Sequence, residues 1–219
     1  MKYAVIGNGK TGSRVQAQLD SLGAENEVFD SENKPTSKRL ASFGVGICFV
    51  NADTFTSLIP LMIESKIPLV IGTTGFEWDS NTFTLVKDNE CKWIKSANFS
   101  IGINLINNFL KKSFNDSGSK LLDYEISIHE KHHENKKDAP SGTALHFSKL
   151  IDREAKISFE RKNDIVGFHS FKMETEDESI TIVHDAKNRN LFARGAVLAT
   201  HYIDTLDYGI HDFEEIINQ

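Results

Sequence analysis

Short apolar runs and helix-like stretches alternate along the first half of the chain. The runs are the length of buried strands, and between them apolar residues recur at helical spacing. The predicted strands are Tyr3–Ile6, Glu27–Phe29, Val45–Val50, Pro68–Ile71 and Lys92–Lys95. Strands that alternate with helices indicate parallel pairing, because each helix returns the chain to the same end of the sheet. Residues 1–98 are therefore expected to form a doubly wound α/β domain.

The pattern changes after Asn98, where strands follow one another more directly. The predicted elements are a helix from Ile101 towards Phe114 and strands at Tyr124–His129, Ile165–Met173 and Ser179–His184. Closely spaced strands favour antiparallel pairing. We expect residues 99–192 to form an α+β domain with an open, mixed sheet whose uncovered face suits another subunit. A C-terminal helix, 193–219, is expected to return to the first domain.

A glycine-rich turn follows the first predicted strand and opens the first helix. It consists of Gly7, Asn8, Gly9, Lys10, Thr11 and Gly12. Glycines allow a tight turn and let the backbone approach a pyrophosphate, while the free amides of the helix start attract its charge. The spacing alone is a weak signal, since an unrelated α/β protein can also start a helix with glycines. Its position favours a Rossmann-like nucleotide site.

Three further segments stand at the ends of predicted strands, where open α/β sheets bind ligands. Asp30 can accept hydrogen bonds from a ribose, although Lys34, Lys38 and Arg39 could instead meet a 2′-phosphate. The sequence therefore leaves NADH and NADPH open. Small and hydroxylated residues that suit a nicotinamide ribose and amide end two other strands: Gly72, Thr73 and Thr74, and Ser96, Ala97, Asn98 and Phe99.

The densest chemistry lies between His129 and Ala144, and it contains a metalloprotease-like pattern. His129–His133 matches HExxH, which binds zinc only when both histidines lie on one helical face. The alternation leading into His129 predicts a strand instead. On a strand the two imidazoles stand about 13 Å apart, too far to share one ion. We therefore expect no metal site.

A helix start follows this segment. Pro140 ends the strand pattern, and Ser141 is a good N-cap for a helix through Leu145 and Ile151. The amides of Gly142 and Thr143 then form a site for a carboxylate. Positive charge precedes it, on His132, His133, Lys136 and Lys137. The arrangement suits a small dicarboxylate, whereas an exposed charged loop would leave the paired imidazoles unexplained.

The segment from His132 to Ala144 resembles the signature of the 4-hydroxy-tetrahydrodipicolinate reductases. Segments at Gly72–Phe76, Ala97–Ser100, His184–Arg189 and Phe192–Ala196 are similar to other parts of that family, in the same order. The resemblance thus spans nearly the whole chain. Where many members have glycine, arginine and methionine in the glycine turn, this chain has Lys10 and Thr11 and one residue fewer.

The resemblance implies a reaction and a set of roles. NADH or NADPH would reduce a cyclic dicarboxylate to tetrahydrodipicolinate in diaminopimelate and lysine biosynthesis. His132 would be the proton donor and Lys136 its catalytic partner. His133, Ser141, Gly142 and Thr143 would bind the substrate, and the glycine turn, Asp30 and the two later strand ends would bind the cofactor. It also implies a homotetramer built by the second domains.

Composition agrees with this interpretation. The 219 residues have a net charge of −6, which argues against a general nucleic-acid binder. No apolar run is long enough to span a bilayer, and the N-terminus lacks the apolar stretch of a signal peptide. Cys48 and Cys91 show no disulfide spacing. A cytoplasmic location without membrane or nucleic-acid partners is expected.

Other functions stay open at this point. A non-catalytic nucleotide sensor of the same fold would have no need of His132, His133 and Lys136. A zinc hydrolase is disfavoured by the predicted strand at His129. Another two-domain reductase of amino-acid metabolism is the nearest alternative.

Overall fold

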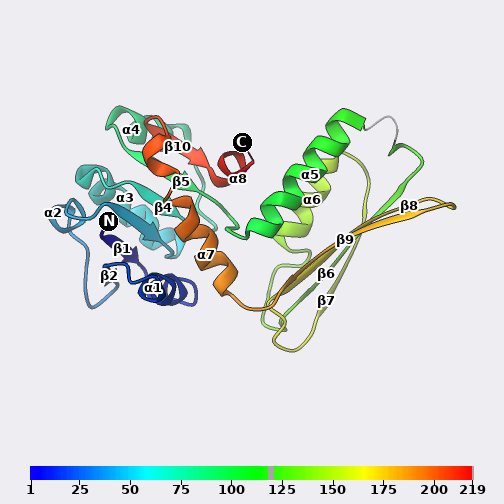
Figure 1. Ribbon diagram of the computed structural model, residues 1–219, viewed down its shortest axis with the longest axis horizontal. Helices are drawn as coiled ribbons and strands as arrows, with labels where there is room; N and C mark the ends of the chain where they lie inside the picture. Colours follow the sequence, from blue (N-terminus) through cyan, green and yellow to red (C-terminus); the bar gives the residue numbers. More distant parts are fainter. Residues whose placement is uncertain (118–120, 219) are drawn as a thin grey trace. The chain divides into compact units, whose positions relative to one another are not determined.

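The computed structural model describes residues 1–117 and 121–218, and the chain divides into two compact units (Figure 1). The first unit combines Met1–Ile101 with Arg189–Gln219, and the second is Gly102–Asn188. Two apolar clusters form the core of the first unit, and a third lies in the second unit. Each unit therefore has its own core.

The first unit is built on a six-stranded sheet in which every neighbouring pair is parallel. In spatial order the strands are β10 (Gly209–Asp212), β5 (Lys92–Lys95), β4 (Leu69–Ile71), β3 (Val45–Cys48), β1 (Tyr3–Ile6) and β2 (Asn26–Phe29). Without β10 the order is 2-1-3-4-5, which reverses direction between β1 and β3. The predicted doubly wound parallel sheet is confirmed.

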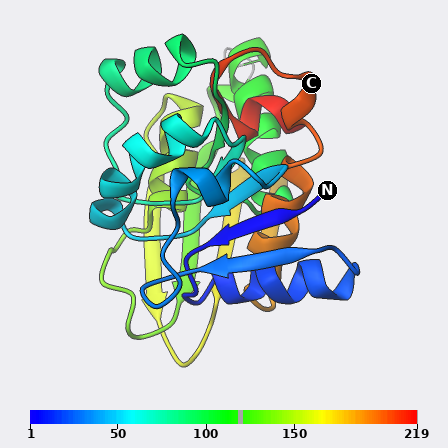
Figure 2. The ribbon, with the colours of Figure 1, turned by 90° about the vertical axis from the view of Figure 1, so that its left-hand side faces the viewer.

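Helices cover both faces of this sheet because its strands are apolar on both sides. One face packs against α1 (Gly12–Ser21), α7 (Asn190–Ala199), a 3₁₀ turn (Ile203–Thr205) and α8 (Phe213–Ile217). The other packs against α2 (Ser37–Leu40), α3 (Ala52–Ser65) and α4 (Ser80–Asp88). In Figure 2, α1 (blue) and α7 (orange) lie side by side, in agreement with their shared core cluster. Each layer removes one apolar face of the sheet from water.

The second unit is a four-stranded mixed sheet with helices on one face. Its strands, in spatial order, are β7 (Lys156–Arg161), β6 (Glu125–His132), β8 (Gly167–Glu174) and β9 (Ser179–Ala186). Only the β6–β7 pair is parallel. Helices α5 (Ile101–Ser117) and α6 (Gly142–Ile151) pack on the face that carries Ile126, Ile128 and Phe171 (Figure 1). The predicted open, mixed sheet is confirmed.

The C-terminal segment differs from the prediction of one helix over 193–219. Helix α7 ends at Ala199, and the chain then adds strand β10 to the edge of the sheet before the short helix α8. Ile210 of β10 packs into the core cluster that contains Trp93. The edge strand has one apolar side chain in four residues, so it shows no strand-like alternation. Residue 219 lies outside the described residues.

No helix among the described residues has the length and apolar character needed to cross a bilayer.

Candidate active site

The ends of five parallel strands are aligned at one edge of the first unit. Ile6, the last residue of β1, pairs with Phe29 and Cys48, the ends of β2 and β3. Cys48 pairs with Ile71, which in turn pairs with Lys95. Every residue that the sequence predicts to bind the cofactor follows one of these ends. The register therefore brings all of these segments to the same edge of the sheet.

Space around the glycine turn differs from one glycine to the next. Gly7 has φ 103°, and a Cβ there would lie 2.3 Å from the carbonyl oxygen of Phe49. A Cβ on Gly12 would lie 1.9 Å from the carbonyl oxygen of Gly7, so the helix start packs directly on the turn. A Cβ on Gly9 would have no non-neighbouring atom of the described residues within 4 Å. The turn is thus tight at both ends and has open space in the middle.

Asp30 and the glycine turn are joined by a hydrogen bond. Asn8 Nδ2 donates to Asp30 Oδ2 over 3.4 Å, while Oδ1 accepts the amides of Glu32 and Asn33 at 2.9 and 3.0 Å. The amide of Asn33, followed by that of Glu32, lowers the pKa of Asp30. The carboxylate is therefore charged at neutral pH and fixed at the end of β2.

Arg39 is engaged in internal contacts instead of facing this edge. Its guanidinium bonds to Glu27, donates to Asn33 Oδ1 over 2.9 Å and lies 4.7 Å over the ring of Phe29. A 2′-phosphate would have to displace these partners.

The two other strand ends are packed into the unit. A Cβ on Gly72 would lie 2.0 Å from Phe49 Cε1, so glycine is needed there for the aromatic ring. Phe99 is buried, and its ring lies 5.9 Å from that of Phe49. Ser96 Oγ donates to the carbonyl oxygen of Asn98 over 3.0 Å. Both segments thus have packing or hydrogen-bond contacts within the first unit.

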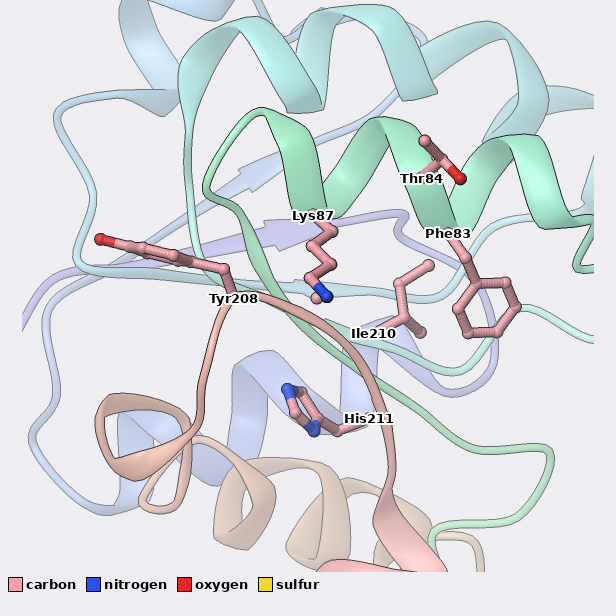
Figure 3. A pocket seen from close by; sticks show the side chains of 7 residues that line it. Phe83, Thr84, Lys87, Tyr208, Ile210 and His211 are labelled. Atoms are coloured by element: carbon pink, nitrogen blue, oxygen red, sulfur yellow. The ribbon is translucent and has the colours of Figure 1, made fainter.

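A separate pocket lies beside the edge strand of the first unit. Phe83, Thr84 and Lys87 of α4 face Tyr208, Ile210 and His211 at β10 (Figure 3). It contains none of the residues predicted to bind the cofactor or the substrate. We assign no role to it in the reaction.

Strand β6 places its side chains alternately on the two faces of the second sheet. Glu130 and His132 are buried on the face that packs against the helices. His129 lies on the opposite face, where Nδ1 is 2.8 Å from Ser158 Oγ and Nε2 is 3.4 Å from Glu160. The predicted strand at His129 is confirmed, so the HExxH pattern does not form a helical zinc site.

Glu130 is fully buried and connects four elements. Its Oε1 accepts the amide of Ser141 at 3.0 Å and Arg161 Nη2 at 2.9 Å. Its Oε2 accepts the Ser141 hydroxyl and lies 3.7 Å from both His132 Nδ1 and His169 Nε2. The carboxylate thus ties β6 to β7, β8 and the start of α6.

Burial has opposite consequences for the acid and the bases of this cluster. It raises the pKa of Glu130, but hydrogen bonds from Ser141 and Arg161 outweigh it, so the net pKa is lowered. Burial lowers the pKa of His132 to about 4 and that of His169 to about 3. At neutral pH the free protein therefore has a charged carboxylate beside two neutral imidazoles.

The start of α6 lies next to this cluster. Ser141 is the N-cap, as predicted, and its Oγ accepts the amide of Ala144 at 3.3 Å. Because Ser141 is buried and its hydroxyl donates to Glu130, this hydroxyl stabilises the start of α6 against β6. Among residues 1–117 and 121–218, none beyond its chain neighbours and its own helix would come within 4 Å of a Cβ on Gly142. The first turn of the helix therefore has open space beside Gly142.

Lys136 lies close enough to affect His132. Its Nζ is 2.8 Å from Asp138 Oδ2, and its charge helps to lower the pKa of His132. Burial raises the pKa of Asp138, but the hydrogen bond and charge of Lys136 and two backbone hydrogen bonds together outweigh it, so the net pKa is lowered. Thus His132, Lys136, Ser141 and Gly142 all belong to one region of the second unit. His133 lies directly after β6, and Thr143 lies in the first turn of α6.

Glu130, His132 and His169 also meet the spacing of a metal site. One ligand atom from each lies within 4.8 Å of the others. However, Glu130 already accepts hydrogen bonds from Arg161 and Ser141. The positive guanidinium would repel a cation, so the contacts favour an internal ion-pair cluster.

Sequence reasoning missed three members of this cluster: Glu130, Arg161 and His169. A signal for Glu130 was available, because it shares the inward face of β6 with Ile126, Ile128 and His132. A carboxylate at a buried strand position needs partners. Those partners come from β7 and β8, which the local pattern does not connect to β6.

The family model described as "Dihydrodipicolinate reductase, C-terminus" matches residues 102–217. A 4-hydroxy-tetrahydrodipicolinate reductase of Hahella chejuensis is 33% identical over 199 residues, covering 80% of this chain and 73% of that protein. One of Methanocorpusculum labreanum is 34% identical over 209 residues, covering 83% and 80%.

A solved structure shares the fold over almost the whole chain. The dipicolinate-bound dihydrodipicolinate reductase from Paenisporosarcina sp. TG-14 superimposes with a TM-score of 0.79 at 21% identity, covering 99% of each chain. A probable dehydrogenase from Thermotoga maritima has a TM-score of 0.61 at 8% identity, covering 99% of this chain and 92% of that one.

Proposed function

Because the chain belongs to the 4-hydroxy-tetrahydrodipicolinate reductase family, we propose that its second unit binds the cyclic dicarboxylate beside α6 and protonates it from His132. The chain is a pyridine-nucleotide-dependent oxidoreductase of diaminopimelate and lysine biosynthesis, and it forms tetrahydrodipicolinate. The position of His132, buried between Glu130 and the cationic segment before α6, is the observation that supports its role most strongly.

The first unit has the features needed to hold the dinucleotide. The glycine turn would bind the pyrophosphate, with open space at Gly9 and the helix dipole of α1 behind it. Gly72 to Thr74 and Ser96 to Phe99 would line the nicotinamide half. When bound, the reduced nicotinamide supplies the hydride.

NADH is the better fit of the two cofactors. Asp30 is charged and can accept hydrogen bonds from a ribose diol, but it would repel a 2′-phosphate. Arg39, one of the three cations that could compensate, is bonded to Glu27 and Asn33.

The dissociation constants of NADH and NADPH, measured by fluorescence titration, test this preference. Wild type is expected to bind NADH about tenfold more tightly, and Asp30→Asn should reduce or reverse the difference. Equal affinities in wild type, or an unchanged ratio in the variant, would remove Asp30 as the discriminating residue.

The substrate carboxylates would be bound by the amides of Gly142 and Thr143 and by the charges of Lys136 and His133. Free amides at a helix start favour an anion, and Lys136 adds a full positive charge. Ser141 would act by capping the helix in the correct orientation. In this proposal the substrate ring would lie beside the imidazole of His132.

Protonation follows from the charge of the bound substrate. Alone, His132 is neutral at pH 7, because burial lowers its pKa to about 4. A nearby dianion raises the proton affinity of an imidazole, so substrate binding would charge it. As hydride reaches the electron-poor unsaturated carbon, the His132 imidazolium would give its proton to the developing anion and return to neutral. The family resemblance implies that water has left the hydroxylated ring before this step.

A direct assay tests the proposal. The purified chain is mixed with NADH and 4-hydroxy-tetrahydrodipicolinate generated in situ, and the loss of reduced nicotinamide absorbance is followed. Turnover that dipicolinate inhibits competitively is expected. Cofactor binding without turnover would instead favour a nucleotide sensor.

We also propose that the second units assemble a homotetramer in the cytoplasm. The face of the sheet opposite α5 and α6 includes Val183, which is 53% exposed, and Phe168. Light scattering should give four times the mass of the 24.6 kDa chain. A monomeric mass at micromolar concentration would contradict it.

A further inference from the structure

We propose that Glu130 is a positioning residue for the proton donor: its carboxylate holds the Nδ1 side of His132, so that Nε2 exchanges the proton with the substrate. This inference rests on the role proposed above for His132. An acidic group that fixes the inner nitrogen of an imidazole also sets which tautomer is present and stabilises the imidazolium when it forms.

The two nitrogens of His132 have different surroundings. Nδ1 is buried and, among the described residues, has no hydrogen-bond partner, while Glu130 Oε2 lies 3.7 Å away. A hydrogen bond requires a shift of less than 1 Å. Such bonds are often long in free enzymes and shorten when the substrate binds.

The opposite edge of the ring faces a glycine. A Cβ on Gly167 would lie 3.3 Å from His132 Nε2 and 3.6 Å from Cδ2. Because Gly167 has no side chain, that residue places no side-chain atom against this edge of the ring. The two observations assign Nδ1 to the carboxylate and Nε2 to the reacting side.

Charged and titratable groups approach His132 from every neighbouring element. Glu130 and Asp138 raise its pKa, and Lys136 and Arg161 lower it. The ring centroid of His169 of β8 lies 5.0 Å from that of His132, and His169 is neutral at pH 7 because its pKa is lowered to about 3. Of the two anions Glu130 has the larger effect and is the one aligned with Nδ1. It is therefore the group that can stabilise the charged imidazole directly.

Glu130 could not be replaced without touching the fold, since it also bonds to Ser141 and Arg161. A test must therefore separate positioning from stability. The suitable set is Glu130→Gln, His132→Gln and the double variant, with Glu125→Gln as control. Glu125 lies on the same strand but is exposed, and it pairs with Lys156 at 2.7 Å.

The four variants are compared by single-turnover assays with enzyme in excess and by kcat and KM as functions of pH. Glu130→Gln should lower kcat on the order of 10²-fold with a smaller change in KM. The loss of kcat at high pH should begin at a lower pH, because the imidazolium has lost its counter-charge. In the His132→Gln background the same change should have almost no further effect, and Glu125→Gln should match wild type.

The outcomes separate this inference from the proposed function. If His132→Gln turns over like wild type, the role of His132 itself fails. If His132→Gln is slow but Glu130→Gln keeps kcat within about threefold and the same pH profile, only the role of Glu130 fails. Additive losses in the double variant also overturn it, since they indicate that Glu130 acts independently of His132.

A measurement on wild type keeps the proposal testable if Glu130→Gln does not fold. Nitrogen-15 NMR of the imidazoles distinguishes the two neutral tautomers. We expect His132 to have its proton on Nδ1, facing Glu130, and to become doubly protonated when dipicolinate and NADH bind. A neutral ring with its proton on Nε2 in both states would overturn the proposal.

Discussion

The edge of the first unit where the five strands end and the charged cluster of the second unit differ in the groups that form them. The edge consists of backbone, glycines and small side chains that follow five strands in register. The cluster consists of buried charged and titratable side chains, with Glu130 bonded to Arg161 and Ser141. One site is shaped by the path of the chain, and the other by side chains from four separate elements.

This difference explains which site tolerates which kind of change. A backbone site fails when atoms are added, because the chain approaches itself closely at Gly7 and Gly12. A buried charge cluster fails when a charge is removed, because the partner is left without compensation. An added side-chain atom should therefore disturb the edge of the first unit more, and the loss of a charge should disturb the cluster of the second unit more.

The largest expected effect is on the chemical step in the second unit. His132→Gln and Lys136→Ala should each lower kcat by about 10²- to 10⁴-fold, because one removes the proposed proton donor and the other the charge proposed to lie beside the reacting ring. The dissociation constant of NADH should stay within about twofold of wild type. Near-normal turnover in both variants would contradict the proposal that the chemical step depends on these two residues of the second unit.

The glycine turn offers a matched pair in the first unit. Gly7→Ala should reduce the free energy of unfolding by about 2 kcal/mol or more, because it places a Cβ at φ 103° against the carbonyl of Phe49. Gly9→Ala meets no atom within 4 Å, so stability should change by less than about 1 kcal/mol. NADH binding should nevertheless weaken, since the added methyl occupies the pyrophosphate space. Urea denaturation measures the stability of each variant, and fluorescence titration measures its affinity for NADH. Equal stabilities of Gly7→Ala and Gly9→Ala would contradict the close packing at Gly7.

Much of this architecture could be predicted from the sequence because it depends on local patterns. The alternation of strand and helix, the glycine turn and the cap at Ser141 are all encoded within short windows. Strand β7 was missed because Lys156–Arg161 is mostly exposed and resembles a charged loop. Without β7 the partner of Glu130, Arg161, could not be identified.

The candidate site, too, could be predicted only where its residues lie close together in the sequence. Lys136 and Gly142 belong to one continuous segment, so the sequence alone indicates that they act together. The approach of His169 to His132 depends on the pairing of β6 with β8, in which Glu130 lies opposite His169. Pairing between distant strands is a property of the tertiary fold, which a single sequence does not display.

A smaller effect concerns stability and pH in the second unit. Burial lowers the pKa of His132 to about 4 and of His169 to about 3, so an unfolded chain binds more protons than the native chain between those values and about 6.5. The free energy of unfolding should therefore decrease as pH falls from about 6.5 towards 4. Urea midpoints measured across that range test this, and His169→Gln should reduce the slope. A flat profile would mean that the imidazoles are not held neutral.

Proton uptake on ligand binding tests the central claim most directly. Titration calorimetry of dipicolinate into the NADH-bound chain, repeated in buffers of different ionisation enthalpy at pH 7, gives the number of protons bound. Wild type is expected to take up nearly one proton, because the dianion charges His132, and His132→Gln is expected to take up almost none. Equal uptake by the two proteins, or none by wild type, would contradict His132 as the proton donor.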